Sequence, residues 1–384
     1  MLIVLAGGGT GGHVYPALAA AAELMASRDK PDAAPGSAGD RLLFVGSQSG
    51  MEQELVGKAG LPFRGVAAAP LLGRSPWRAM VSLARLGTGL IQALFLMRQQ
   101  APDVILATGG YVCVPVVLAG WLSGVPSVVY LPDVEPGWAV RFLSRFARRI
   151  GVTSPDSLRF LPAAKTAVTG YPVRPELRAA KREEGRRLLG LSPVAKVLLV
   201  VGGSRGAHQI NAAVAESLPQ LVDVAEVVHS CGPSDYEWLN GRRAELRSEL
   251  ARRYHLTSYL HAELAPAMAA ADLVVSRAGA SVMGEYPARG LPSVLVPYPH
   301  AGAHQELNAD YLVQRGAAVK IANNNLTGQT LLQTVAALLD DEQRRQAMSL
   351  AARQLDHSEA ARALADLVQA VGAGRRPLRG KEQP

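Results

Sequence analysis

The chain has 384 residues, of which 48% are hydrophobic and 19% are charged. This length and composition predict an ordered globular protein of two or three domains and exclude a disordered or fibrous chain. The formal net charge of +8 indicates anionic partners, and nucleic acid, an anionic membrane surface and a phosphorylated substrate all fit this charge.

The first residues and the cysteines bear on the compartment. A short apolar run without a charged flank precedes the first glycines, so we expect a first strand and no signal peptide. Because the chain lacks an uninterrupted apolar run of about 18 residues, we expect no spanning helix. Cys113 and Cys231 lie far apart in apolar surroundings, and we expect two buried free thiols, as in a reducing compartment.

Short apolar strands alternate with helical segments through the first 170 residues. Strands are predicted at residues 2–6, 42–45, 104–107 and 127–131. A glycine loop at residues 7–12 leads to a helix predicted at residues 15–25, where Pro16 is tolerated because it lies in the first turn. This alternation predicts a parallel, doubly wound sheet.

The glycine loop matches the G-x-G-x-x-G pattern of nicotinamide-binding and flavin-binding folds through Gly7, Gly9 and Gly12. Such folds also carry a carboxylate at the end of the second strand, where it binds a ribose. Here that strand ends in Gly-Ser-Gln-Ser at residues 46–49. The missing carboxylate argues against a dinucleotide site.

An apolar segment at residues 79–98 has two interpretations. It is either a core helix or an interfacial helix that dips into lipid headgroups beside basic residues. The nearby arginines are Arg74, Arg78, Arg85 and Arg98. A second basic cluster belongs to the same surface or is a solvated helix face, and its members are Arg141, Arg145, Arg148 and Arg149.

The pattern of strand, glycine loop and helix starts again after residue 170. A strand at residues 197–201 leads into a second glycine loop at residues 202–206. Later strands are predicted near residues 226–229, 273–275, 293–296 and 317–321. Two such series predict an α/β protein with two Rossmann-like, doubly wound parallel-sheet domains that face each other across a cleft.

Residues 276–309 combine the features of a nucleotide-sugar site. Small residues at 276 and 278–281 leave backbone N–H groups at a helix N-terminus, where a phosphate is favoured. Glu285 lies one turn into that helix, and a polar loop follows at residues 300–308. A carboxylate in a first helical turn is itself stabilised by about 0.3–1 kcal/mol, so Glu285 either binds a ribose or only supports the helix.

Three motifs, in order, resemble the MurG family within glycosyltransferase family 28. They are GGGTGGHVYPALA at the first glycine loop, GGSRGAHQIN at the second, and SRAGASVMGE from residue 276, followed by GLPSVLVPYPHAGAHQELNA. The resemblance implies the GT-B fold. It also implies an acceptor-binding, membrane-facing domain at residues 1–170, a UDP-sugar-binding domain at 171–350, and, at 351–384, a helix that crosses back to the first domain and a basic tail.

The activity implied by the resemblance is that of an inverting N-acetylglucosaminyltransferase of peptidoglycan synthesis. Such an enzyme moves N-acetylglucosamine from its UDP carrier to undecaprenyl-diphospho-muramoyl-pentapeptide. The implied partners are a UDP-sugar donor, a lipid-linked acceptor and an anionic inner membrane surface, and no nucleic acid. The implied location is peripheral, at the cytoplasmic face of the cell membrane.

The resemblance further implies roles for individual residues. On the acceptor side, these are Thr10 and His13 for catalysis, and Gly11, Gly12 and Tyr111 for acceptor binding. On the donor side, Ser204 contacts the diphosphate, Glu285 the ribose, and His304 with Gln305 the sugar, while Arg174 and Arg277 match donor-site arginines.

Two positions depart from the family pattern. His304 stands where the family commonly has glutamine, and Leu-Pro-Asp-Val-Glu at residues 131–135 stands where it carries His-Glu-Gln-Asn in the acceptor cleft. One alternative is therefore a related GT-B transferase with another lipid or small-molecule acceptor. The other is a nucleotide-sugar-binding subunit without activity, against which Thr10 and His13 argue.

Glycosyl transfer requires removal of the acceptor's proton and stabilisation of the departing diphosphate. A neutral imidazole suits the first task near pH 7, so we expect His13 to be the general base, with phosphate binding or helix capping as the alternative. Helix N-termini and arginines can perform the second task. The sequence has no D-x-D triplet and no His/Cys cluster at metal-ligand spacing, so we expect no metal or other cofactor.

Overall fold

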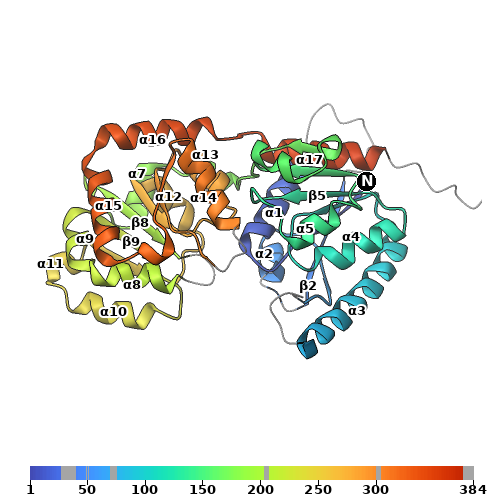
Figure 1. Cartoon of the computed structure of the whole chain (residues 1–384), viewed down its shortest axis with the longest axis horizontal. Coiled ribbons are helices and arrows are strands. Elements are labelled where there is room, and N and C mark those ends of the chain that lie inside the picture. The colour runs from blue at the N-terminus through green and yellow to red at the C-terminus, as the bar shows by residue number, and fades with distance from the viewer. Residues whose placement is uncertain are drawn as a thin grey trace, which may run out of the picture. The chain divides into compact units, whose positions relative to one another are not determined.

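The computed structural model of the chain describes residues 1–26, 40–48, 50, 52–69, 76–202, 207–299 and 304–374, without the side chains of 76–79. The chain divides into two compact units. Unit 1 comprises Met1–Pro172 and Glu359–Pro384, and unit 2 comprises Val173–Ser358. Each unit contains one parallel β-sheet with helices packed against it (Figure 1).

The sheet of unit 1 has seven parallel strands in the order β3-β2-β1-β4-β5-β6-β7. Its strands are β1 (Leu2–Ala6), β2 (Arg41–Ser47), β3 (Phe63–Val66), β4 (Val104–Ala107), β5 (Ser127–Leu131), β6 (Arg149–Val152) and β7 (Thr166–Val168). The strand order reverses between β1 and β4, which pair directly. Open α/β sheets bind ligands at such a reversal, outside the carboxyl ends of the strands. The first glycine loop leaves β1 at this place.

Helices cover both faces of this sheet. One apolar core includes α1 (Gly11–Ala26) and α2 (Glu52–Lys58), and the other includes α3 (Pro76–Gln100), α4 (Cys113–Leu122) and α5 (Trp138–Leu143). Two 3-10 helices, η1 (Pro155–Phe160) and η2 (Ala163–Lys165), lie between β6 and β7. Every residue of β1 is buried because helices cover both of its faces, which explains its uninterrupted apolar sequence.

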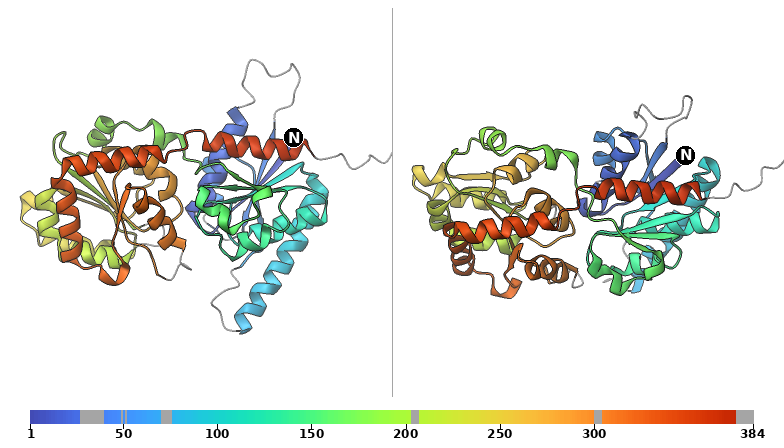
Figure 2. Two further views of the ribbon diagram at one scale, coloured as in Figure 1. Left: turned by 45° about the horizontal axis from the view of Figure 1, so that its top comes forward. Right: turned by 90° about the horizontal axis from the view of Figure 1, so that it is seen from above.

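Helix α17 (Ala360–Ala373) follows unit 2 in the sequence but belongs to unit 1. It packs beside α1, as the views in Figure 2 show near the N-terminus. Leu364, Ala365 and Val368 recur at helical spacing and are buried in the core shared with α1. The last described helix therefore covers part of one face of the sheet that begins with the first residues.

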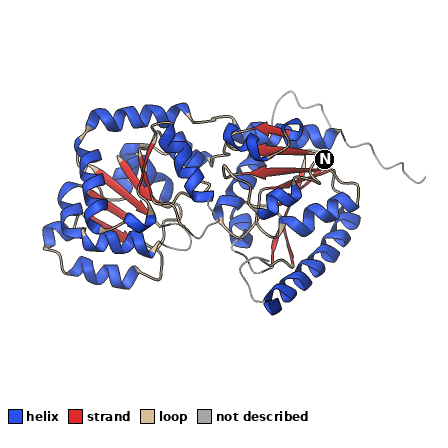
Figure 3. Cartoon of the chain, viewed as in Figure 1, coloured by secondary structure: helices blue, strands red, loops and turns tan. Residues whose placement is uncertain are grey.

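The sheet of unit 2 has six parallel strands in the order β10-β9-β8-β11-β12-β13, between helices (Figure 3). Its strands are β8 (Val197–Val201), β9 (Glu226–Ser230), β10 (Tyr254–Thr257), β11 (Leu273–Ser276), β12 (Ser293–Leu295) and β13 (Ala318–Lys320). The order reverses between β8 and β11. The second glycine loop and the loop before Glu285 leave these two strands. Both loops therefore lie at the carboxyl ends of the strands, where such sheets bind ligands, and we call this side of the sheet the ligand edge.

The helices of unit 2 begin with α6 (Pro175–Ala179), α7 (Arg182–Leu188), α8 (His208–Glu216), α9 (Leu218–Val224), α10 (Tyr236–Ala244) and α11 (Ser248–Ala251). They continue with α12 (Leu264–Ala270), α13 (Val282–Arg289), α14 (His304–Gln314), η3 (Asn323–Asn325), α15 (Gly328–Asp340) and α16 (Glu342–Gln354). Helices α8, α9 and α15 share the apolar core of the sheet, and α12 packs on α7 and β8.

Two expectations about the elements were wrong. Helix α1 begins at Gly11 rather than at residue 15, because the carbonyl of Thr10 already accepts from the N–H groups of His13 and Val14 at 3.1 and 3.3 Å. The strands β3, β6, β7 and β10 were not predicted. They have three or four residues each and carry polar or half-exposed positions, so their apolar pattern is too short to stand out.

The cysteines and α3 bear on the other expectations. Cys113 and Cys231 are buried and free, as predicted. Among the described helices, only α3 contains a segment, Met80–Gln100, that is long and apolar enough to cross a membrane by length and composition. Its mean hydropathy is 1.5 and 33% of it is buried in the fold, and buried core helices meet the same criterion. The absence of a spanning helix stays a prediction.

Candidate functional site

His13 lies in the first turn of α1, and its ring bonds back to the glycine loop. Nδ1 is 3.3 Å from the carbonyl oxygen of Gly8 and 3.3 Å from Oγ1 of Thr10. A carbonyl oxygen can only accept, so the bond to Gly8 requires the ring proton on Nδ1. In the neutral ring, Nε2 is then the unprotonated nitrogen, and this is the nitrogen that a general base needs free.

A second glycine turn, at the end of β4, interlocks with the first loop. Thr108 Oγ1 donates to the carbonyl of His13 at 2.6 Å, and the N–H of Gly8 donates to the carbonyl of Gly109 at 3.3 Å. Gly109 and Gly110 have φ angles of +119° and +86°, which other residues rarely adopt. A Cβ atom on Gly110 would lie 2.3 Å from the Gly8 carbonyl oxygen, so only glycine allows this approach.

The other predicted acceptor-side residues lie beside these turns. Gly11 and Gly12 are the first residues of α1, whose first N–H groups have no partner within the helix. Tyr111 follows the second glycine turn directly and is 38% exposed. The structure therefore gathers the predicted acceptor-side residues at the carboxyl ends of two paired strands, β1 and β4.

The segment at residues 131–135, which departs from the family pattern, starts at the last residue of β5 and continues into the loop that follows it. Leu131 and Val134 are buried in the core. Glu135 forms an ion pair with Arg141 at 3.2 Å. These side chains contribute to packing and to a surface ion pair, so we expect polar acceptor contacts in unit 1 to come from Thr10, His13 and Tyr111.

The donor-side glycine loop follows β8. Residues 203–206, and Ser204 with them, lie outside the described residues. Helix α8 begins at His208 directly after this loop.

A chain of hydrogen bonds holds the start of α8, and the sequence did not predict it. His229 is fully buried, with Nδ1 2.8 Å from the Tyr254 hydroxyl and Nε2 3.0 Å from Oδ1 of Asn211. Asn211 donates to Asp235 at 2.7 Å, and Nδ1 of His208 lies 3.0 Å from the same carboxylate. Burial lowers the pKa of His229 to about 3, so the ring is neutral. The sequence shows only a histidine beside two valines in this strand, which gives no sign of its partners.

Glu285 lies in the first turn of α13, as predicted, and is buried. Its Oε1 is 3.2 Å from Nη2 of Arg174, which precedes α6. Burial raises the pKa of Glu285 above its usual value, and the positive charge of Arg174 opposes that rise. Two residues predicted separately for the donor site are thus in direct contact.

The guanidinium of Arg277 connects two segments at the ligand edge, the one after β12 and the one after β13. Its Nη1 donates to Oδ1 of Asn323 at 2.7 Å and to the carbonyl of Val296 at 3.1 Å, and its Cζ lies 5.3 Å from the ring centroid of Tyr298. Burial lowers the pKa of this guanidinium from its usual value. A contact with the donor would add to this structural role, and it stays a prediction.

His304 and Gln305 begin α14, just after residues 300–303, which lie outside the described part. Oε1 of Gln305 accepts from the N–H of Tyr298 at 2.9 Å, which fixes the side-chain amide at this edge. Nδ1 of His304 is buried and has no hydrogen-bond partner among the described residues. A buried polar atom of this kind requires a partner, and a ligand hydroxyl could supply one.

A carboxylate that the sequence did not predict lies beneath the first glycine loop. Glu52 is fully buried in the first turn of α2, and its Oε1 accepts from the N–H and the hydroxyl of Ser47 at 2.7 and 2.6 Å. Residues 46–49 contain no carboxylate, yet the next helix supplies one to the end of β2. Ser47 occupies Oε1 of Glu52, and Gly8 and Gly46 pack closely against its side chain, so Glu52 is held inside the fold and does not support a dinucleotide site.

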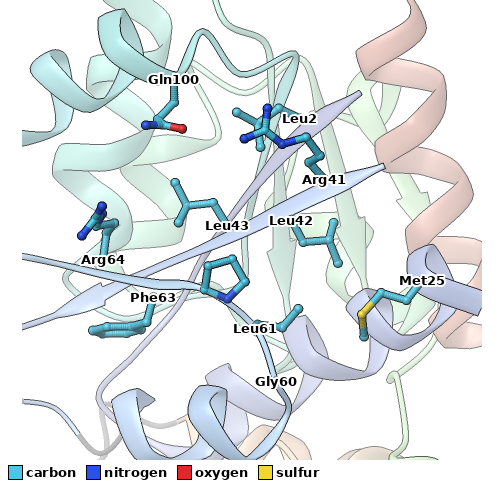
Figure 4. Close-up of a pocket in the computed structure, with 11 residues that line it drawn as sticks. Leu2, Met25, Arg41, Leu42, Leu43, Gly60, Leu61, Phe63, Arg64 and Gln100 are labelled. Atoms are coloured by element: carbon cyan, nitrogen blue, oxygen red, sulfur yellow. The ribbon is translucent and has the colours of Figure 1, made fainter. Parts of the chain in front are cut away.

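A cavity of about 550 Å³ opens at the amino-terminal ends of the unit 1 strands, away from the glycine loops (Figure 4). Its lining includes the first residues of three strands, Leu2, Arg41 and Phe63. The length of β1 separates it from the glycine loop by about 15 Å, at roughly 3.3 Å per residue. This cavity is therefore not part of the candidate site.

Comparison with known proteins bears on both units. Residues 3–152 match the N-terminal domain of glycosyltransferase family 28, and residues 197–367 match its C-terminal domain. A UDP-N-acetylglucosamine–N-acetylmuramyl-(pentapeptide) pyrophosphoryl-undecaprenol N-acetylglucosamine transferase from Roseiflexus sp. (strain RS-1) is 43% identical, over 96% of this chain and 94% of its own length.

Two further relatives agree. A transferase of the same name from Desulforudis audaxviator (strain MP104C) is 42% identical, over 98% of this chain and 100% of its own length. Among solved structures, the crystal structure of Acinetobacter baumannii MurG is similar with a TM-score of 0.70 and 26% identity, over 96% of this chain and 99% of that one.

Proposed function

The chain belongs to glycosyltransferase family 28, with its fold of two Rossmann-like domains, and we propose that it transfers N-acetylglucosamine from UDP-N-acetylglucosamine to undecaprenyl-diphospho-muramoyl-pentapeptide. The observation that carries the proposal is the similarity over nearly the whole chain to two transferases of that one name. The packing of residues 131–135 keeps open a related transferase with another acceptor.

In this proposal the donor binds at the ligand edge of unit 2. Glu285 accepts hydrogen bonds from the ribose hydroxyls, and Arg174 holds its carboxylate in place at 3.2 Å. Ser204 and its loop contact the diphosphate, where the N-terminus of α8 favours negative charge. His304 and Gln305 contact the sugar, and the buried Nδ1 of His304 is suited to bond one of its hydroxyls.

The reaction proceeds by one displacement at the anomeric carbon. Nε2 of His13 takes the proton of the acceptor hydroxyl as that oxygen attacks, and the bond between the anomeric carbon and the UDP oxygen breaks. Attack from the face opposite to UDP inverts the configuration. Thr10 and the N–H groups of Gly11 and Gly12 hold the acceptor beside His13, and Tyr111 borders it.

UDP leaves with the electron pair of the broken bond, and its negative charge must be stabilised. We assign this task to the N-terminus of α8 and to the arginine charges of unit 2, because fixed dipoles and cations perform it without a metal. Within the described ranges, no three or more His, Cys, Asp or Glu side chains are placed to hold a metal ion. Catalysis without a metal is part of the proposal.

The acceptor's lipid chain requires contact with a membrane, and we assign that contact to a surface of unit 1 formed by α3, α4 and α5. Helix α4 packs against both of the others, and α3 lies on the outside of the unit (Figure 1). Exposed apolar side chains on this α3–α5 surface are Met80, Leu83, Ile91, Phe95, Trp121, Leu122 and Trp138. Buried residues such as Leu86 and Met97 anchor α3, so this helix is both core and surface.

Aromatic rings and arginines complete the α3–α5 surface. Trp138 stacks on Phe142 at 5.7 Å, and Trp121 meets Phe146 edge to face at 5.2 Å. Exposed arginines on these helices are Arg85, Arg98 and Arg141, and the exposed Arg145 and Arg148 follow α5 in the chain. Amphipathic aromatic residues and cations favour the interface of an anionic bilayer, so we propose peripheral binding at the cytoplasmic face of the cell membrane.

Three of the predicted basic positions are not used in this surface. Arg74 and the side chain of Arg78 lie outside the described part of the chain. Arg149 begins β6 and donates to the carbonyl of Ala164 at 2.8 Å, so it supports the sheet edge.

The test is turnover of UDP-N-acetylglucosamine by the purified full-length chain, with and without a short-chain analogue of the lipid-linked muramoyl-pentapeptide. We expect UDP release only when the analogue is present. Donor binding without transfer to this analogue would leave the donor site in place and overturn the acceptor assignment. No binding of UDP or of its sugar would overturn the whole proposal.

A further inference from the structure

Glu52 is a buried carboxylate that contacts the same glycine loop as His13, the proposed general base. Its Oε1 is anchored by both donors of Ser47, at 2.7 and 2.6 Å, and its Oε2 lies 3.5 Å from the N–H of Gly9. The fit around it is close, since a Cβ atom on Gly8 would come within 2.5 Å of Oε1 and one on Gly46 within 2.6 Å of Cγ. Only glycines leave room for this carboxylate under the loop.

One peptide group connects Glu52 to His13. The carbonyl of Gly8 accepts from Nδ1 of His13 at 3.3 Å, and the N–H of Gly9 faces Glu52 at 3.5 Å. This carbonyl and this N–H belong to the same planar peptide group between Gly8 and Gly9. The carboxylate and the imidazole therefore bond to opposite ends of one rigid dipole.

This arrangement has a chemical consequence for the ring. A carboxylate that accepts from a peptide N–H polarises the peptide and makes its carbonyl a stronger acceptor, since hydrogen bonds in a chain strengthen one another. A stronger acceptor at Gly8 favours the proton on Nδ1 of His13. Catalytic histidines are commonly held in one tautomer by a carboxylate bonded directly to the ring, and here a peptide group stands between them.

We propose that Glu52 is a positioning residue for the transfer reaction. Through the peptide group between Gly8 and Gly9, it holds His13 in the Nδ1–H tautomer and leaves Nε2 as the base. The inference rests on the proposed role of His13 as general base. It also explains why a fully buried carboxylate lies at a glycine loop that contains no charged residue of its own.

The test measures the tautomer of His13 directly, by nitrogen-15 NMR of the histidine rings in the full-length chain. Protonated and unprotonated ring nitrogens give separate signals, and a His13→Gln variant identifies those of His13 among the eight histidines. We expect Nδ1–H in the wild type and a shift toward Nε2–H in Glu52→Gln. Glu54→Gln is the matched control, because Glu54 lies on the same helix, is exposed and forms an ion pair with Lys58 at 2.7 Å.

Kinetics provide the second measurement. We expect kcat in Glu52→Gln to fall by about tenfold to hundredfold. This is the usual loss when a residue that orients a functional side chain, without touching the substrate, is removed. The donor KM should stay within twofold of the wild type, because Glu52 belongs to unit 1 and the proposed donor site to unit 2. A role in folding alone would lower the melting temperature without changing the tautomer of the folded fraction.

A wild-type tautomer in folded Glu52→Gln overturns the inference. If that variant does not fold, Ser47→Ala serves instead, because it removes the 2.6 Å anchor of Oε1 and keeps the buried carboxylate. A wild-type tautomer in Ser47→Ala would then overturn the inference, and a partial shift supports it. If His13→Gln retains activity, the general-base role fails, and the NMR result still shows whether Glu52 controls the ring.

Discussion

Arg174 and Glu285 are 111 residues apart in the sequence, yet their side chains form an ion pair of 3.2 Å. The two side chains are only 12% and 6% exposed. Arg174 precedes α6, at the start of unit 2, and Glu285 lies in the first turn of α13. The carboxylate is held before any ligand arrives, so a ribose would bind without the cost of ordering it.

Glu285→Gln should raise the donor KM by about 10-fold to 100-fold, because a hydrogen bond to a charged group contributes roughly 1.5–3 kcal/mol. We expect a smaller change in kcat, since the ribose is remote from the bond that breaks. Steady-state kinetics and titration calorimetry with UDP measure both quantities. The control is Glu176→Gln, which removes a second carboxylate 3.9 Å from Arg174 that is 61% exposed. Equal donor affinity in the two variants would refute ribose binding by Glu285.

His13→Ala should lower kcat by about 10²- to 10⁴-fold, the usual contribution of a general base. The affinity for UDP should not change, because His13 lies in unit 1. Single-turnover rates with saturating donor and acceptor separate the chemical step from binding. His357→Ala, at an exposed histidine, serves as the control and should keep full activity. A loss of less than tenfold in His13→Ala would leave only the phosphate-binding or capping role.

Gly110→Ala should destabilise unit 1 more than Gly60→Ala does. Both glycines have positive φ, +86° and +69°, so both variants carry left-handed strain of about 1–2 kcal/mol. Gly60 faces open space, whereas a Cβ on Gly110 would lie 2.3 Å from the Gly8 carbonyl that orients His13. We expect a further loss of roughly 1–3 kcal/mol from overpacking, together with reduced kcat. Urea unfolding measures the free energies, and equal values would contradict the interlocked turns.

The buried His229 makes stability depend on pH. Its pKa is about 3 in the folded chain, below its ordinary value of 6.5, so the unfolded chain takes up the proton first as the pH falls. The free energy of unfolding should therefore be fully present above pH 6.5 and decrease toward pH 3, by about 1.4 kcal/mol per pH unit. Between pH 7 and pH 5 this amounts to roughly 2 kcal/mol in urea unfolding. His229→Gln should be less stable at pH 7 and lack this decrease, and an unchanged slope would contradict the prediction.

Leu83→Asp should weaken binding to vesicles of anionic lipid by about tenfold or more, since a buried leucine contributes roughly 1.5–3 kcal/mol. Leu350→Asp is the matched control, because Leu83 and Leu350 are 64% and 62% exposed and Leu350 lies on α16 in unit 2. Cosedimentation at low and high salt measures both variants. We expect weaker binding in high salt and to neutral lipid. The same loss in both variants would refute the α3–α5 surface as the membrane contact.

The features that sequence patterns predicted are those that depend on neighbouring residues. The central strands of both sheets are uninterrupted apolar runs because helices cover both of their faces. Glu285 was expected in a first helical turn and lies there. The three motifs identified the family, since their order and spacing are properties of the sequence alone. Short strands such as β3 and β7 were missed because three or four half-exposed residues carry too little pattern.

The partners of the site residues were decided by the tertiary structure. Glu52 reaches the glycine loop from a different helix, across 43 residues from Gly9, and Arg174 reaches Glu285 across 111. The proton on Nδ1 of His13 follows from a carbonyl that the folded loop places within 3.3 Å. Local sequence determines which segments are apolar and where the backbone can turn, because these depend on a few adjacent side chains. Which side chains then bond depends on how the packed sheet brings together residues that are far apart in the sequence. No local pattern encodes the distance between two such residues in the fold.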